Sequence, residues 1–344
     1  RRLTACARAE SRHPSSHFWR VMVLSVASLL WFFGACGVTV VLLLGALLLG
    51  LRWYSRRCSG ASEITRALKG RETIGLFHPY AHAGGGGERV LWCAIHAVQE
   101  SHPGVVCVVY TGDTDVAKPK FLELARDRFG VEVKADTVEF VHLRKRWWVE
   151  ASTWRRFTLL GQSFGSVILG WEALCSFRPD VFIDSMGYAF TFPLFALVGS
   201  CRIGCYVHYP TISTDMLARV KSRDLGVCND RAVARSGVLS SAKLLYYKAF
   251  AWVYSVVGRF AEVVMVNSSW TGGHINSLWK IPDRTSVVFP PCDTRMLAAL
   301  PLDRCPADGG GFLVLSLAQF RPEKDHPLQL RALTRFFELV PQHR

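Results

Sequence analysis

Four consecutive glycines follow an apolar run at 74–78 that has the composition of a buried strand. A helical pattern restarts directly after them, so the glycines place bare backbone N–H groups at a helix N-terminus. Because glycine has no side chain, a phosphate or a sugar can approach such a backbone closely. The run does not match the G-x-G-x-x-G dinucleotide fingerprint, and a purely structural turn is the alternative. The residues expected to face a ligand here are Gly84, Gly85, Gly86, Gly87, Glu88 and Arg89.

A second stretch with chemical potential lies near the end of the sequence, where Arg321 and Lys324 come just before a helical pattern. Two cations at a helix N-terminus would hold a diphosphate and stabilise the negative charge that develops as it leaves. Gln319 and Glu323 lie in the same segment and are expected to contact the same ligand. The alternative is a pair of solvated cations in an exposed loop.

Further polar residues follow other apolar, strand-like runs. In a doubly wound parallel sheet, ligands bind beyond the carboxyl ends of the strands, so these residues are candidates for a binding site. His208 closes one run and is followed by Tyr209 and a proline, although a histidine there can also be purely structural. The other candidates at strand ends are Asp184, Ser185, Asn267 and Ser268.

Two sequence patterns invite a metal interpretation. Asp113 and Asp115 form a D-x-D pattern, which can hold a divalent cation on a nucleotide-sugar diphosphate. A helical pattern follows directly, so we expect Asp115 to cap that helix instead. Cys201 and Cys205 lie close together but lack the second pair that tetrahedral zinc requires. We therefore expect no metal site and no cofactor.

Strand and helix signals alternate through most of the chain, which predicts βαβ units, an α/β fold and a parallel doubly wound sheet. Pro, Asp and Gly dominate 291–311, which predicts a linker between a first domain at 72–290 and the start of a second at 312–344. The expected strands are 74–78, 105–110, 138–141, 181–183, 203–207 and 263–266, with a further strand at 312–317 opening the second domain.

An uncharged run at 21–51 is long enough to cross a bilayer and is expected to be a retained transmembrane anchor. It follows an N-terminal tail at 1–20 and precedes a basic stalk at 52–71. A cleaved signal peptide is the alternative, but its apolar region is only about 7–15 residues long. Cationic residues flank the run almost equally, so charge does not orient it. The dispersed cysteines favour a reducing compartment, which places the globular part in the cytosol.

The net charge of +14 favours an anionic partner: a phosphate-bearing ligand, an acidic membrane surface or nucleic acid. Cations alternate with tryptophans at 142–156, which is typical of a membrane interface or of a solvated basic face. The apolar, aromatic stretch at 239–258 predicts either an interfacial helix or a core helix. Nucleic-acid binding fits poorly with a membrane anchor.

Taken together, several motifs resemble the endoplasmic-reticulum α-1,2-mannosyltransferases that extend dolichol-linked oligosaccharides with GDP-mannose. These enzymes belong to glycosyltransferase family 4, whose GT-B fold has two Rossmann-like domains. The resemblance covers the anchor and the chain from about Thr73 to Val340. The motifs that carry it are His78-Pro79-Tyr80, the glycine run through Trp92, Asp184 to Tyr188, His208 to Met216, Val266 to Thr271, Pro290 to Asp293 and Phe320 to Lys324.

This resemblance implies a metal-independent, retaining transferase that adds the fourth and fifth mannoses, in α-1,2 linkage, on the cytosolic face of the endoplasmic reticulum. Its first domain would bind the diphosphodolichol-linked oligosaccharide, and its second domain would bind GDP-mannose. The implied partners are these two substrates and the bilayer, with other reticulum mannosyltransferases as further candidates and no nucleic acid. A non-catalytic membrane-anchored scaffold of the same fold and a transferase for another sugar are the alternatives.

The resemblance also implies roles for individual residues. Lys324 resembles the lysine that contacts the donor diphosphate, and His208 resembles the first-domain histidine near the transferred sugar. Gly85 to Gly87 resemble the loop that packs against the reacting centre. Most family members place a diphosphate-binding arginine where this chain has Gln319, so Arg321 is expected to replace it. The acidic E-x7-E motif of the family would lie beyond Arg344.

Overall fold

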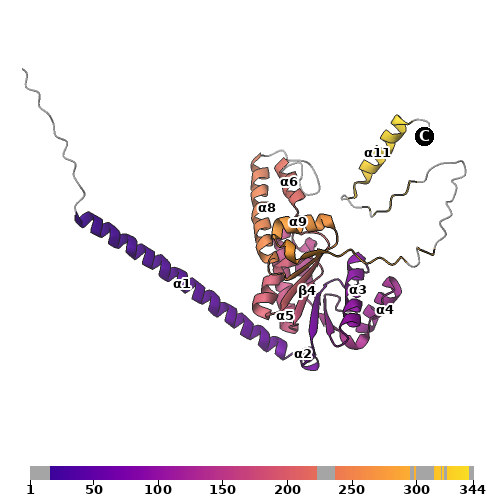
Figure 1. Cartoon of the computed structure of the whole chain (residues 1–344), viewed down its shortest axis with the longest axis horizontal. Coiled ribbons are helices and arrows are strands. Elements are labelled where there is room, and N and C mark those ends of the chain that lie inside the picture. The colour runs from indigo at the N-terminus through magenta and orange to yellow at the C-terminus, as the bar shows by residue number, and fades with distance from the viewer. Residues whose placement is uncertain are drawn as a thin grey trace, which may run out of the picture. The chain divides into compact units, whose positions relative to one another are not determined.

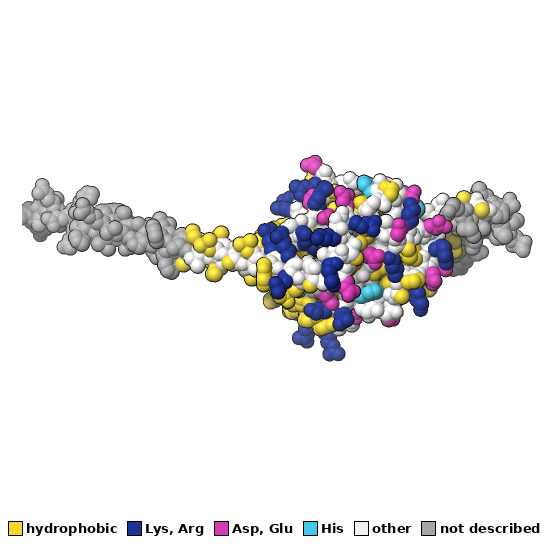
Figure 2. Space-filling model, turned by 90° about the horizontal axis from the view of Figure 1, so that it is seen from below, with side chains coloured by type: hydrophobic (Ala, Val, Ile, Leu, Met, Phe, Trp, Pro, Cys, Tyr) yellow, Lys and Arg dark blue, Asp and Glu magenta, His cyan; other side chains and the backbone are white. Residues whose placement is uncertain are grey.

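A computed structural model describes residues 16–222, 237–294, 298–299, 314–318, 320 and 324–340, with side chains from Cys36 onward. Helix α1 (Ser16–Gly60) contains the predicted anchor. The part whose side chains are described, Cys36–Gly60, is long and apolar enough to cross a membrane, and its most apolar stretch has a mean hydropathy of 2.0 and no buried residue. Figure 2 shows hydrophobic side chains around this helix, whereas Lys and Arg intermingle with Asp and Glu on the globular part. The chain separates into two compact units after Arg57.

The second unit is built on one parallel sheet of seven strands in the order β3-β2-β1-β4-β5-β6-β7. Its first six positions reproduce the doubly wound order, in which the direction of winding reverses between β1 and β4. The predicted α/β class and parallel sheet are therefore confirmed. The strands are β1 (Thr73–Phe77), β2 (Val106–Thr111), β3 (Val138–His142), β4 (Val181–Asp184), β5 (Arg202–Val207), β6 (Val263–Val266) and β7 (Thr285–Val287).

Helices cover both faces of the sheet because each parallel connection must cross over it. Figure 1 shows α3 and α4 together on one side, and α5 and α8 on the other. The helices of this unit are α2 (Glu63–Ala67), α3 (Gly86–Ser101), α4 (Lys118–Phe129), α5 (Thr158–Ser176), α6 (Thr214–Ser222), α8 (Gly237–Gly258), α9 (Ser269–Trp279) and α11 (His326–Leu339).

Aromatic side chains fill the core on both faces of the sheet. Under α3 and α4, Trp92 and Phe121 are fully buried with the apolar residues of β2. On the other face, the rings of Phe182 and Phe195 stack with centroids 3.6 Å apart. Burying rings of this size contributes much of the free energy of folding. The core therefore fixes the strand ends that carry the candidate site.

The two aromatic stretches for which a membrane interface was one of two interpretations, 142–156 and 239–258, each pack partly into the fold. In the basic stretch, the Trp147 and Trp148 rings stack at 4.5 Å, and Trp147 remains half exposed. Helix α8 buries Tyr247 and Tyr254 but leaves Trp252 70% exposed. The stretch at 239–258 is thus a core helix along one face, with an apolar surface on the other.

Two local predictions differ from the structure, and one strand was not predicted. Asp115 does not cap α4, which begins at Lys118 with Ala117 at the N-cap and Pro119 in its first turn. Proline fixes this start because it lacks the N–H that helix interiors require. The strand predicted at 312–317 is not formed at 314–318, where no described residue pairs with it. Strand β7 was not predicted, since three residues at a sheet edge carry little pattern.

Candidate functional site

The carboxyl ends of β1, β4 and β5 meet where the winding direction reverses, which is the position at which doubly wound folds bind ligands. His78 follows β1, Ser185 follows β4, and His208 follows β5. The pairing of Phe77 with Asp184 across β1 and β4 brings the first two together. The topology thus joins residues that lie 107 positions apart in sequence.

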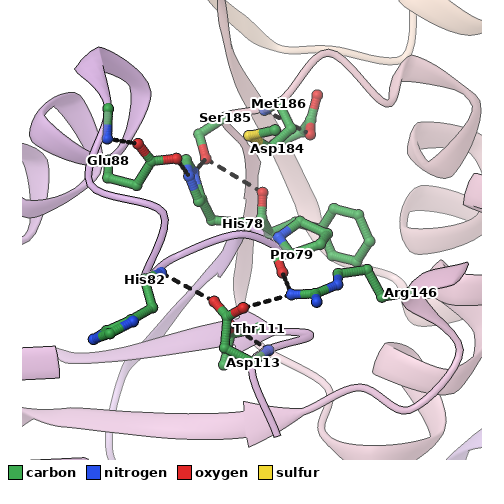
Figure 3. Close-up of polar contacts among 12 residues, drawn as sticks. His78, Pro79, His82, Glu88, Thr111, Asp113, Arg146, Asp184, Ser185 and Met186 are labelled. Carbon is green, nitrogen blue, oxygen red and sulfur yellow. Dashed lines mark hydrogen bonds and ion pairs between the residues drawn. The ribbon is translucent and has the colours of Figure 1, made fainter. Parts of the chain in front are cut away.

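His78 is fully buried and makes contacts through both ring nitrogens. Its Nδ1 lies 2.8 Å from Ser185 Oγ, and its Nε2 lies 3.2 Å from Glu88 Oε1. Figure 3 shows the ring between these two side chains. The backbone N–H of His78 donates to the Tyr110 carbonyl on β2, so the residue is held by both neighbouring strands.

Glu88 connects this histidine to the glycine turn. Its Oε2 accepts a hydrogen bond from the N–H of Gly85, the N-cap residue of α3. This is one half of a capping box; glycine has no side chain to form the other half. Burial raises the pKa of Glu88, but the hydrogen bond from His78 and the backbone N–H bonds outweigh burial and hold it below its usual value. Glu88 is therefore ionised at neutral pH.

The glycines differ in what surrounds them. Gly84 has φ +77° and packs against the Arg128 side chain, so a substituent there would be strained and crowded. Gly86, the first residue of α3, faces open space, with no atom within 4 Å of a Cβ placed there. A Cβ on Gly87 would lie 3.7 Å from His208 Nε2 and 3.8 Å from His78 Cε1. The helix start and the two histidines therefore form one cluster.

One ring nitrogen of His208 makes no hydrogen bond to the described residues. Its Nε2 is buried and has no hydrogen-bond partner among the described residues. Its ring packs on Tyr206, with centroids 4.8 Å apart. Burial lowers the pKa of His208, nearby His78 lowers it further, and Glu88 opposes both. The imidazole is therefore neutral at pH 7, which leaves it able to hydrogen-bond a hydroxyl group.

Asp184 shapes the loop after β4. It is fully buried, and its carboxylate accepts N–H bonds from Met186 at 3.1 Å and Gly187 at 2.9 Å. Gly187 has φ +91°, which favours glycine. Burial raises the pKa of Asp184 to about 7, against the lowering effect of these backbone bonds. The side chain is committed to its own loop, and its direct contact with a substrate stays a prediction.

The other first-domain candidates lie around this cluster. Arg89 donates to the Phe129 carbonyl at 3.1 Å and lies 3.9 Å from the Asp293 carboxylate. Tyr209 is 57% exposed, with its ring 5.3 Å from that of Trp270. Asn267 and Ser268 both hydrogen-bond the Thr271 side chain, and Ser268 is the N-cap residue of α9. Their predicted roles in substrate binding are not tested by these contacts.

Asp113 supports the loop that follows β1. Its carboxylate accepts bonds from the His82 N–H and from Arg146, as Figure 3 shows. The Arg146 guanidinium lies over the Tyr80 ring at 4.9 Å and also donates to the Pro79 carbonyl. Asp113 therefore ties the His78-Pro79-Tyr80 segment to the basic-aromatic stretch.

Of the second-domain candidates, only Lys324 lies within the described residues. It is exposed and directly precedes Asp325, whose side chain caps α11 through the Leu328 N–H at 3.1 Å. The lysine is thus at a helix N-terminus, as the sequence predicts. Gln319, Arg321 and Glu323 lie outside the described residues.

His78 is a member of this cluster that the sequence motifs alone do not predict as a site residue. The signal that could have identified it is its place directly after β1, the central strand next to the reversal of winding. An acid three residues into a helix was a second signal, because Glu at that position reaches back to the helix start.

Comparison with known proteins assigns the chain to a family. Residues 71–279 match the family model described as ALG11 mannosyltransferase N-terminus. The chain belongs to this family. The matched range contains β1 to β6 and every first-domain residue of the cluster described above.

Curated relatives named GDP-Man:Man(3)GlcNAc(2)-PP-Dol alpha-1,2-mannosyltransferase are similar to most of the chain. Those from Mus musculus and Homo sapiens are each 51% identical over 300 residues, covering 87% of this chain and 60% of the relative. The one from Dictyostelium discoideum is 50% identical over 274 residues, covering 79% and 54%. The chain therefore spans about 60% of the length of the mammalian relatives.

Among solved structures, the chain is similar to a UDP-glucosyltransferase from Polygonum tinctorium, with a TM-score of 0.36, 12% identity and coverage of 68% of this chain and 56% of that one. It is also similar to CalG4, the calicheamicin glycosyltransferase, with a TM-score of 0.32, 14% identity and coverage of 64% and 53%. Likenesses this weak decide nothing, and the fold assignment rests on the sheet itself.

Proposed function

We propose that the whole protein transfers mannose from GDP-mannose, in α-1,2 linkage, to a diphosphodolichol-linked oligosaccharide, adding its fourth and fifth mannoses. The observation that carries this proposal is identity of about 50% to curated relatives named GDP-Man:Man(3)GlcNAc(2)-PP-Dol alpha-1,2-mannosyltransferase. The cluster at the reversal of winding supports it, because the match includes the residues that form the cluster. We further propose that the reaction retains anomeric configuration and uses neither metal nor cofactor.

In the proposed reaction, the bond between the anomeric carbon and the β-phosphate oxygen of GDP-mannose breaks, and GDP leaves. A bond forms between the anomeric carbon and the 2-hydroxyl oxygen of the acceptor mannose, and the proton of that hydroxyl passes to the departing diphosphate of GDP. Positive charge develops on the sugar and negative charge on the diphosphate. Lys324, with Arg321, would stabilise the diphosphate. The neutral His208 would orient the mannose through its unpartnered Nε2.

We propose that the first domain binds the acceptor at the glycine turn and that the second domain binds GDP-mannose. The open space next to Gly86 supports this arrangement, because the acceptor needs room at the reacting centre. We propose a location in the endoplasmic-reticulum membrane; helix α1 supports the membrane part of this proposal, because it is long and apolar enough to cross a bilayer. The catalytic part would face the cytosol.

The test is a transfer assay on the full-length protein with GDP-mannose and a short-chain lipid carrying the trimannosyl oligosaccharide. The expected product carries five mannoses, and Lys324→Ala should reduce its rate about 100-fold. Lys120→Ala is the matched control, because Lys120 is an exposed lysine in the first turn of α4. Acceptor binding without transfer would instead indicate a scaffold, and a product with another sugar would indicate a different transferase. Undiminished activity in Lys324→Ala would refute its role.

A further inference from the structure

We propose that His78 is a positioning residue that acts through Glu88 to hold the first turn of α3 in place beside His208. His78 does not reach a substrate itself, because its side chain is fully buried. Instead it is the middle member of a chain of contacts that runs from Ser185 through Glu88 to the Gly85 N–H.

The direction of one hydrogen bond in this chain follows from the chemistry of its members. An ionised carboxylate can only accept, and the hydrogen bonds to Glu88 favour its ionised form. The 3.2 Å contact therefore requires His78 Nε2 to carry a hydrogen, and the Nε2–H group donates a hydrogen bond to Glu88 Oε1. The second carboxylate oxygen is then oriented toward the Gly85 N–H.

This contact matters because it is the side-chain bond that holds the Gly85 N–H at the start of α3. Gly85 has no side chain to complete the capping box, and Gly86 touches nothing within 4 Å of where a Cβ would lie. Four adjacent glycines also have more backbone freedom to lose than other residues. A buried, charge-assisted pair compensates for that freedom, since such hydrogen bonds are roughly twice as strong as neutral ones.

The arrangement fixes the distance between the start of α3 and the His208 ring. Gly87 packs toward both histidines, at 3.7 Å from His208 Nε2 and 3.8 Å from His78 Cε1, measured from an ideal Cβ. If Glu88 lost its partner, the start of α3 would move relative to His208. For the transferase this consequence rests on the proposed function, and it predicts a lower kcat with an unchanged KM for GDP-mannose.

Two isosteric variants separate positioning from simple packing. The Gln side-chain nitrogen can occupy the place of Nε2, so His78→Gln keeps the donor to Glu88 and loses the contact to Ser185. The Asn side chain can reach only the place of Nδ1, so His78→Asn keeps Ser185 and loses Glu88. Both variants remove the buried ring, so a purely structural role predicts similar effects.

The experiment is hydrogen–deuterium exchange on the intact chain in detergent micelles, followed in peptides covering 80–92. We expect His78→Asn to exchange about tenfold faster there and His78→Gln to stay close to the unmodified protein. Peptides from β2 report the integrity of the fold. If His78→Asn also loosens β2, Glu88→Ala provides the same test with His78 in place, and it should open the turn while β2 stays protected.

His274 supplies the matched control. It is also buried, with Nδ1 2.7 Å from the Thr214 hydroxyl and Nε2 3.4 Å from the Asp215 carboxylate, but it lies on α9. His274→Asn should leave exchange at 80–92 unchanged. Equal behaviour of His78→Gln and His78→Asn, whether both protected or both open, would overturn the proposal.

Exchange does not depend on activity, so its outcome holds even if the transfer assay refutes the proposed function. If the full-length protein transfers mannose, kcat should fall in His78→Asn and be recovered in His78→Gln, with the KM for GDP-mannose constant. A kcat loss of the same size in both variants would contradict positioning through Glu88.

Discussion

Replacing Asp184 with asparagine should change how the stability of the globular unit depends on pH. Burial raises the pKa of this carboxyl to about 7 in the folded chain, against a reference value of 3.8. The folded state therefore binds more protons than the unfolded state between these values, and stability falls as pH rises from about 4 to about 7. Three pKa units correspond to roughly 4 kcal/mol over the whole range.

Between pH 5 and pH 7.5, this linkage gives a loss of about 2–3 kcal/mol in the free energy of unfolding. Asparagine does not titrate, so Asp184→Asn lacks that loss. The variant gives up one acceptor for the Met186 or Gly187 N–H, which costs about 1–2 kcal/mol. We expect it to be less stable than the unmodified chain at pH 5 and at least as stable at pH 7.5.

The assay is urea denaturation in detergent micelles, followed by tryptophan fluorescence at both pH values. The difference in the free energy of unfolding between the unmodified chain and Asp184→Asn reports on Asp184 alone, because the contributions of the other titrating groups cancel. His208 is one such group, and its lowered pKa gives a slope of opposite sign. Asp180→Asn is the control, since Asp180 accepts two bonds from Thr73 near the other end of β4 but is exposed. Parallel pH curves for Asp184→Asn and the unmodified chain would refute the reasoning.

Three further perturbations test other parts of the structure. Gly86→Leu should abolish transfer by the full-length protein, whereas GDP-mannose binding, measured by calorimetry, should persist. The control is Gly273→Leu, which changes an equally open helical glycine and should retain both transfer and binding. Trp279→Ala should lower the free energy of unfolding by about 3–5 kcal/mol in urea titrations, because the Trp279 ring is fully buried. Trp252→Ala should change that free energy by less than about 0.5 kcal/mol, because the Trp252 side chain is 70% exposed. The transfer rate should stay level as pH falls to 6.5 and decline only below it, because burial keeps His208 neutral; a decline centred above pH 6.5 would contradict that assignment.

Much of the sheet could be predicted because most of its strands carry continuous β-branched, apolar runs, and β2 is buried along its whole length. The runs at 105–110 and 263–266 correspond to β2 (Val106–Thr111) and β6 (Val263–Val266). Strand β7 was not predicted because its three residues, Thr-Ser-Val at the edge of the sheet, form neither a long run nor an apolar one. The start of α4 was misjudged because a capping aspartate was weighed without the proline that follows it.

The candidate site was predictable in its members but not in its contacts. Strand ends identified His208 and Ser185, and the glycine run identified Glu88. Local pattern contains no information that His78 contacts Ser185, because that contact depends on β4 entering the sheet beside β1. The burial of Asp184 is likewise a consequence of the assembled sheet, since a D-S-M-G sequence alone also fits an exposed turn.

The position of β1 in the sheet also affects how the chain folds during synthesis. Its two neighbours are β2, about 33 residues later, and β4, whose pairing Val181 lies 107 residues after Ile74. At about 5–20 residues per second, translation needs roughly 5–20 s to supply that second neighbour. Until then one edge of β1 has no native partner and can pair with other chains. Any sheet of β1 to β3 that forms before then has α3 and α4 on only one face, and the histidine cluster can form only after β4 and β5 have been made.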